Sequence, residues 1–162
     1  MGTKEAIKKP RQCVGKKVNV LKDFLIKIIN AGEWWHVTPR DSDAYKKRGK
    51  FLASTYLQAE FYGRPNMEPE RVEIRNPIFG FSEKEILKQL FKSTELNLLE
   101  DIINSKKDIY QKRIALDAKM HKKAKLLEYD SIVLMTEQGK IALQKGRKPN
   151  SIELNLIQGR DE

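Results

Sequence analysis

The chain has 162 residues, a formal net charge of +10 and a single cysteine, Cys13. This length fits one domain with a hydrophobic core, and one cysteine excludes an internal disulfide. Two histidines and one cysteine are too few for a structural zinc site, and no apolar run reaches the roughly 18 residues of a membrane-spanning helix. We therefore expect a single cytoplasmic domain over residues 17–162, with no membrane partner, after a mobile basic tail over residues 1–16.

The first half of the chain predicts a helix, short strands and a second short helix. Apolar residues recur at steps of three and four over residues 18–29, which is one face of a helix. Residues 33–38 are aromatic and β-branched, which predicts a strand closed by Pro39. Further elements are expected as a brief helix or turn over residues 41–48, a strand over 51–54 and a helix over 56–62.

The second half predicts strands on both sides of a long helical region. Residues 71–75 alternate charged and apolar side chains, which predicts a half-exposed strand. Ser82 and Glu85 predict a capping box at the start of a helix. A longer helical region is expected over residues 95–127 with a break near Asn104-Ser105, then strands over 131–135, 141–143 and 151–157, with a turn at Gln138-Gly139. This order of elements predicts an α+β fold.

Four polar residues stand where they can line one ligand site. His36 and Thr38 share a face of the first expected strand, where an imidazole and a hydroxyl can bind ligand hydroxyls. Tyr62 lies one turn after Ala59 on the same helical face, where its ring can cover a flat ligand. Glu153 points away from its apolar neighbours in the last strand. Each residue alone is more typical of an ordinary core or surface position.

The order of these segments resembles the NAD-binding signature of ADP-ribosyltransferases of the diphtheria-toxin and poly-ADP-ribose-polymerase type. That family presents His-Gly-Thr, then Ser-Thr with Ala-x-x-Tyr, then Ser-Val-Glu. The matching segments here are His36-Val37-Thr38, Ser54-Thr55 with Ala59 to Tyr62, and Ser151-Ile152-Glu153, and Leu127 to Val133 is similar to a segment of bacterial and phage relatives. The resemblance covers residues 33–157 and implies split antiparallel β-sheets with flanking helices.

The resemblance also implies that NAD is the substrate and that the bond between nicotinamide and ribose is cleaved. Glu153 is the implied catalytic residue, since a carboxylate stabilises the positive charge that develops on the ribose. The implied NAD-binding residues are His36 and Thr38 at the adenosine ribose, Tyr62 on the nicotinamide, and also Ser54 and Val37. The reaction needs no metal. The resembled family binds NAD without a G-x-G-x-x-G loop, and this chain has no such loop either.

Several positions depart from the family pattern. Val37 stands where the family has glycine, so its side chain must face away from the ligand. Leu52-Ala53 stand where the toxin group has an aromatic residue, which leaves an apolar wall with less stacking. Ser151 stands where many arginine-directed members have Glu or Gln, which disfavours an arginine acceptor. The charge of +10 instead favours a nucleic-acid or acidic-protein acceptor.

Two alternatives stay open. A non-catalytic basic module would bind nucleic acid through a helix face with Lys119 to Lys125 and His121, although such a run is more often a solvated surface. A transferase-like fold that has lost its activity is the second alternative, because a fold alone does not fix a function.

Overall fold

The computed structural model describes residues 20–91 and 93–158, so the expected tail and Cys13 lie outside the described residues. Five strands form one sheet in the order β1-β2-β5-β4-β3. The central strand β5 is antiparallel to β2 and to β4, whereas β3 runs parallel to β4 at one edge. The strands are β1 (Trp35–His36), β2 (Lys50–Ala53), β3 (Pro77–Gly80), β4 (Ser131–Leu134) and β5 (Glu153–Leu156).

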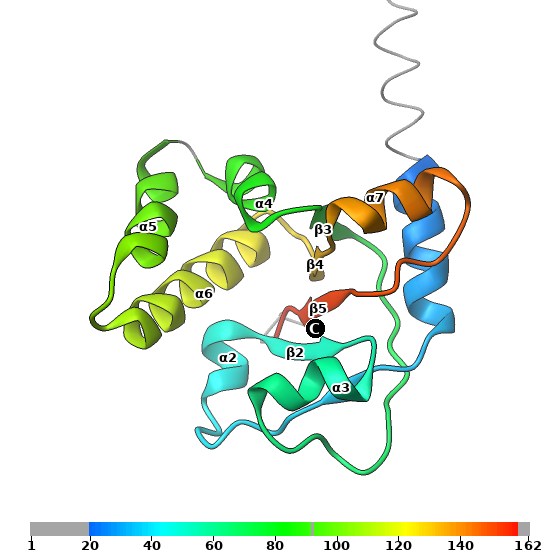
Figure 1. Ribbon diagram of the computed structural model, residues 1–162, viewed down its shortest axis with the longest axis horizontal. Coiled ribbons are helices and arrows are strands. Elements are labelled where there is room, and N and C mark those ends of the chain that lie inside the picture. The colour runs from blue at the N-terminus through cyan, green and yellow to red at the C-terminus, as the bar shows by residue number, and fades with distance from the viewer. Residues whose placement is uncertain (1–19, 92, 159–162) are drawn as a thin grey trace, which may run out of the picture.

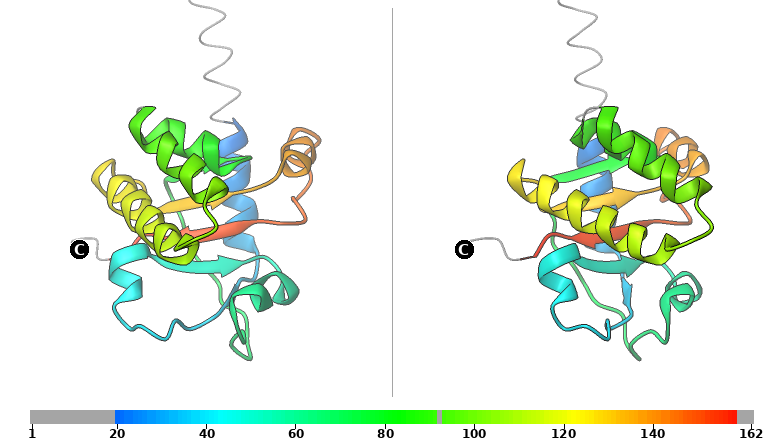
Figure 2. Two further views of the ribbon diagram at one scale, coloured as in Figure 1. Left: turned by 60° about the vertical axis from the view of Figure 1, so that its left-hand side comes forward. Right: turned by 90° about the vertical axis from the view of Figure 1, so that its left-hand side faces the viewer.

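Helices cover both faces of the sheet (Figure 1). One face carries α4 (Glu83–Leu90), α5 (Ser93–Asn104) and α6 (Ile109–Leu126), and the other carries the helix over residues 20–31 and α7 (Glu137–Gln144). Near β2 lie α2 (Ala44–Arg48), α3 (Tyr56–Ala59) and the 3-10 helix η1 (Glu60–Tyr62). Figure 2 shows the same layers from two further directions. None of the described helices is long and apolar enough to cross a membrane.

The core consists of two apolar clusters, one on each face of the sheet. Neighbouring residues of β4 contribute to different clusters, because successive strand side chains point to opposite faces. Ile132 packs with side chains of α4, α5 and α6, and Val133 packs with side chains of the helix over residues 20–31. Burial on both faces explains why β4 has a continuous apolar run instead of an alternating pattern.

The expected α+β class is confirmed, but the arrangement of the sheet differs from the expected one. The described residues form one mixed sheet and not two split antiparallel sheets. The difference arises at β3 and β4, which are parallel neighbours. Parallel neighbours need a long crossover connection, and α4, α5 and α6 supply it between these two strands.

Several local predictions are confirmed. The expected break at Asn104-Ser105 separates α5 from α6. The hydroxyl of Ser82 accepts a hydrogen bond from the backbone N–H of Glu85 at 3.2 Å, as in a capping box. The Glu85 carboxylate accepts its bond from the N–H of Phe81 at 3.0 Å, one residue earlier than the usual partner. These signals depend only on neighbours along the chain.

The expected strand over residues 71–75 is wrong. Ile74 is buried and Glu73 is exposed, so the alternation was correct. However, the backbone of Ile74 pairs with a side chain and not with a strand: its N–H donates to Oδ1 of Asn30 at 2.7 Å, and its carbonyl accepts from Nδ2 at 3.0 Å. The strand comes later, as β3, which begins with Pro77 at the sheet edge, where proline is tolerated.

The expected strand over residues 141–143 and the turn at Gln138-Gly139 are also wrong, because both lie in α7. The hydroxyl of Thr136 caps this helix by accepting a hydrogen bond from the N–H of Gly139 at 3.2 Å. Gly139 is buried, and a Cβ there would lie 3.2 Å from the Cβ of Met135. The glycine therefore allows close packing of a helix and does not form a turn.

Candidate functional site

The fold brings Glu153 next to Tyr62, which is 91 residues away in the chain. Glu153 opens β5, and Tyr62 is the last residue of η1, which directly follows α3. The Tyr62 hydroxyl donates a hydrogen bond to Oε1 of Glu153 at 2.9 Å. Thr55 fixes the start of α3, since its hydroxyl accepts a hydrogen bond from the N–H of Gln58 at 3.1 Å. Two predicted site residues thus meet.

The environment of Tyr62 keeps its hydroxyl protonated. Burial of this group, the negative charge of Glu153 and the hydrogen bond to it together raise the pKa of Tyr62 to about 12. The residue as a whole is nevertheless 67% exposed, so much of its surface stays accessible. Tyr62 can therefore donate a hydrogen bond at neutral pH while its ring stays available to a flat ligand.

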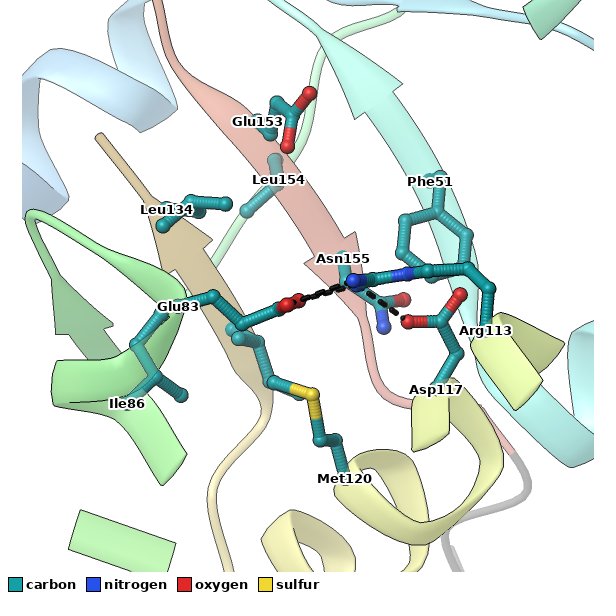
Figure 3. A pocket seen from close by; sticks show the side chains of 11 residues that line it. Phe51, Glu83, Ile86, Arg113, Asp117, Met120, Leu134, Glu153, Leu154 and Asn155 are labelled. Atoms are coloured by element: carbon teal, nitrogen blue, oxygen red, sulfur yellow. Dashed lines mark hydrogen bonds and ion pairs between the residues drawn. The ribbon is translucent and has the colours of Figure 1, made fainter. Parts of the chain in front are cut away.

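A hollow beside Glu153 lies between β5 and the helices α4 and α6 (Figure 3). Arg113 of α6 donates from Nη1 to Oε1 of Glu83 at 2.6 Å and from Nη2 to the other oxygen of Glu83. The same Nη2 donates to Oδ1 of Asp117 at 2.8 Å. The exposed ring of Phe51 forms another part of the lining. Two carboxylates therefore share one guanidinium beside the Tyr62–Glu153 pair.

Partial burial shifts pKa values within this ion cluster. The Glu83 and Asp117 side chains are only 17% and 15% exposed. Burial raises the pKa of Asp117 in spite of the neighbouring Arg113 charge, whereas the hydrogen bond to Glu83 raises the pKa of Arg113. With Glu153, three carboxylates and one guanidinium line the hollow. Its local charge is thus negative, although the chain is strongly basic.

Asn155 also lines the hollow and is only 6% exposed. Its Nδ2 donates to the carbonyl of Arg48 at 2.9 Å, and its Oδ1 accepts no hydrogen bond within the described part of the chain. Oδ1 instead packs against Gly49, where a Cβ would lie only 2.1 Å away. Gly49 also has φ +87°, so both the space and the backbone conformation require glycine there.

His36 is not brought to the Tyr62–Glu153 pair. In the sheet register His36 pairs with Leu52 and Leu52 with Leu154, whereas Glu153 pairs with Ala53. Paired residues of neighbouring strands point to the same face, and successive residues to opposite faces. The register therefore places the His36 side chain on the face opposite to that of Glu153.

Both ring nitrogens of His36 have partners inside the protein. Nδ1 donates to the carbonyl of Phe51 at 2.7 Å, and Nε2 accepts from the hydroxyl of Tyr45 at 2.8 Å, an assignment that follows because a carbonyl can only accept. The residue is 4% exposed. Contact between His36 and NAD stays a prediction, and in this conformation the ring links β1, β2 and α2.

The other predicted NAD-binding residues, Thr38, Val37 and Ser54, have different neighbours. Thr38 is exposed, and its hydroxyl donates to Oδ1 of Asn66 at 3.2 Å. Val37 is half-buried, and its Cγ1 would lie 3.0 Å from a Cβ on Gly63. Ser54 accepts a hydrogen bond from the N–H of Ile152, the residue before Glu153, at 3.1 Å. Of these three, Ser54 is the one that the structure links to the strand of Glu153.

Sequence reasoning missed the ion cluster and the side chain of Gln58. Arg113 and Asp117 are four residues apart on one helix, which is a recognisable pairing signal. Glu83 lies 30 residues before Arg113, so no local pattern could reveal that contact. The same holds for Gln58, whose partner Ser151 is 93 residues away.

Comparison with protein-family models, with curated proteins and with solved structures found no match to this chain. Within residues 20–91 and 93–158, no group of three or more His, Cys, Asp or Glu side chains is arranged to hold a metal ion. The functional proposal therefore depends on the geometry of the hollow and of the Tyr62–Glu153 pair.

The contacts of His36 lead to a first prediction. His36→Ala is expected to lower the free energy of unfolding by about 2 kcal/mol, because the Phe51 carbonyl and the Tyr45 hydroxyl would lose a buried partner. Urea unfolding measures the change, and Thr38→Ala, at an exposed position, is the matched control. A His36→Ala protein with unchanged unfolding but weaker NAD binding would instead assign the ring to the ligand.

Proposed function

We propose that the protein is an NAD-dependent ADP-ribosyltransferase that uses Glu153 as its catalytic carboxylate. The observation that carries this proposal is the 2.9 Å contact between the Tyr62 hydroxyl and Oε1 of Glu153 beside the hollow. The sequence resemblance assigns these two residues to the nicotinamide end of NAD. The proposal also includes a relationship to that family, although the described residues form one mixed sheet, and a cytoplasmic location.

Two features of the site support a role at the reactive end of NAD. Oε1 of Glu153 is engaged by Tyr62, and no donor among the described residues reaches Oε2, which leaves an acceptor for a ribose hydroxyl. The exposed faces of Tyr62 and Phe51 offer aromatic surface to a planar ring. The contacts of His36, Thr38, Val37 and Ser54 with NAD stay predictions, and the catalytic role of Glu153 does not depend on them.

Glu153 would act by charge. When the glycosidic C–N bond breaks, the electron pair stays with the nicotinamide nitrogen and positive charge develops on the ribose. The Glu153 carboxylate stabilises that charge more in the transition state than in the ground state, which is what accelerates a reaction. Tyr62 holds the carboxylate in place by donating to Oε1. The acceptor oxygen or nitrogen then bonds to the ribose carbon and releases its proton to solvent.

The acceptor is proposed to be a nucleic acid or an acidic protein, because the net charge of +10 attracts such partners to the molecule, although three carboxylates line the hollow itself. The exposed side chains of Lys119, Lys122 and Lys125 on α6 also favour a second candidate function, non-catalytic binding of nucleic acid. His121 does not belong to that face. It is 2% exposed, and its Nε2 accepts a hydrogen bond from the N–H of Gln158 at 3.0 Å.

The test incubates the wild type and Glu153→Ala with NAD and measures free nicotinamide by chromatography. Release by the wild type and none by Glu153→Ala is the expected result. Absence of release, no NAD-induced change in Tm and strongly salt-dependent binding of single-stranded DNA would replace the enzyme by the nucleic-acid-binding module. Equal release by both proteins would remove Glu153 from the catalytic role.

A further inference from the structure

Gln58 of α3 connects the two segments that carry Tyr62 and Glu153. Its Oε1 accepts a hydrogen bond from the hydroxyl of Ser54 at 3.0 Å. Its Nε2 donates to the hydroxyl of Ser151 at 3.0 Å. The side chain of one glutamine thus spans from the end of β2 to the residues that lead into β5.

These contacts hold the two residues directly before Glu153. Ser151 and Ile152 are the two residues before Glu153, and both are held: Ser151 by Gln58, and the N–H of Ile152 by the hydroxyl of Ser54 at 3.1 Å. Ser54 therefore accepts from Ile152 and donates to Gln58, which uses both capacities of a hydroxyl. Movement of the Gln58 side chain would disturb the whole connection.

The other end of the connection is Tyr62, four residues after Gln58 in the continuous turn of α3 and η1. Gly63, with φ +140°, ends this segment directly after Tyr62. The position of Tyr62 relative to Glu153 thus depends on how α3 is fastened to β5. The side chain of Gln58 fastens α3 to the residues leading into β5 by its hydrogen bond to Ser151. The Tyr62–Glu153 bond is the second link between these two segments.

We propose that Gln58 is a positioning residue, which holds Glu153 at its working distance from Tyr62 through Ser151 and Ser54. This inference rests on the proposed transferase function for its catalytic consequence, whereas the geometric part stands on the hydrogen bonds alone. A carboxylate displaced by about 1 Å loses much of its effect on the reacting atoms, because such a displacement can cost on the order of 100-fold in rate.

Gln58→Met and Gln58→Glu form the test. Methionine keeps the length of the side chain but makes neither hydrogen bond, so kcat for nicotinamide release is expected to fall about tenfold with little change in KM. Glutamate can accept from both serine hydroxyls, because the hydroxyl of Ser151 can donate as well as accept, and should restore most of kcat. Leu57→Ala is the matched control, since Leu57 is 75% exposed on the same helix.

A second readout does not require activity. Loss of the Tyr62–Glu153 contact should bring the pKa of Tyr62 from about 12 toward the ordinary value of 10. NMR of ring-labelled tyrosine follows this titration, and Tyr62→Phe assigns the signal. A lower Tyr62 pKa in Gln58→Met supports positioning even if the wild type leaves NAD intact, an outcome that would remove the transferase function alone. An unchanged kcat and an unchanged Tyr62 pKa in Gln58→Met would overturn the positioning role and leave the function standing.

Discussion

Glu153→Gln is expected to lower the rate of nicotinamide release at saturating NAD by about 100-fold or more, the usual loss when one preorganised electrostatic group is removed. Glutamine has the shape of glutamate but no charge, so it can still bind a ribose hydroxyl. The interaction lost is the one that grows as positive charge develops in the transition state. We therefore expect kcat to fall while KM changes little, as measured by chromatography of the released nicotinamide.

The fold should survive this substitution. The Tyr62 hydroxyl can donate to the amide oxygen of glutamine as it does to Oε1 of Glu153, so Tm should stay close to that of the wild type. The matched control is Glu73→Gln, because the Glu73 side chain is 74% exposed and its ion pair within residues 20–91 and 93–158 is with a surface arginine, Arg75. If Glu153→Gln kept the wild-type kcat, the carboxylate would have no catalytic role.

The parts of the site that the sequence could predict depend on local chemistry. A capping hydroxyl and the helix that it starts are neighbours in the chain, so Thr55 and the helical segment that ends in Tyr62 were both recognisable. Glu153 was recognisable from its place between apolar residues of a strand. The contact between Tyr62 and Glu153, 91 residues apart, was expected from the order of motifs in the resemblance and not from any local pattern.

His36 illustrates what a local pattern leaves open. Alternation within a strand predicts which residues share a face, but only the pairing register decides whether the faces of two strands coincide. The register of the two-residue strand β1 is fixed by its pairing with β2, in which His36 lies opposite Leu52. A shift of one residue would have moved His36 to the face of Glu153, and nothing in residues 33–38 specifies that choice.

Long-range partners explain the other differences. The segment around Ile74 has the alternation of a strand, yet the amide of Asn30 takes the place of a neighbouring strand. Long-range contacts also determine the local charge of the hollow. The chain is basic overall, but contacts across 30 residues between Arg113 and Glu83 gather carboxylates beside Glu153. Composition gives the sum of the charges and not their position.

Arg113→Met is expected to lower the free energy of unfolding at neutral pH by about 2 to 3 kcal/mol, somewhat less than the loss of a fully buried ion-pair partner. Arg113 is 41% exposed, which moderates the effect, but its two partners are 17% and 15% exposed. Without the guanidinium, Glu83 and Asp117 would face each other as half-desolvated negative charges. Urea unfolding monitored by circular dichroism measures the change.

The loss should depend on pH, and its sign follows from Asp117. Burial already raises the pKa of Asp117 above its ordinary value of 3.8, so the folded protein holds this proton more tightly than the unfolded chain does. The positive charge of Arg113 lowers the pKa of Asp117, so removal of Arg113 should raise this pKa further. Protonation then relieves the unpaired charge, so the destabilisation should be largest at neutral pH and shrink as the pH falls through the raised pKa.

Lys112→Met separates this effect from the general loss of a basic residue on α6. Lys112 pairs with Asp101 at 2.9 Å, but their side chains are 32% and 57% exposed, so the change should cost less than about 1 kcal/mol. It should also show little dependence on pH in the acidic range. Equal destabilisation by both substitutions, with the same pH profile, would mean that the ion cluster beside Glu153 is no more than a solvated surface pair. A larger and acid-relieved loss for Arg113→Met alone would mean that the protein maintains two poorly hydrated carboxylates next to Glu153 by means of one guanidinium.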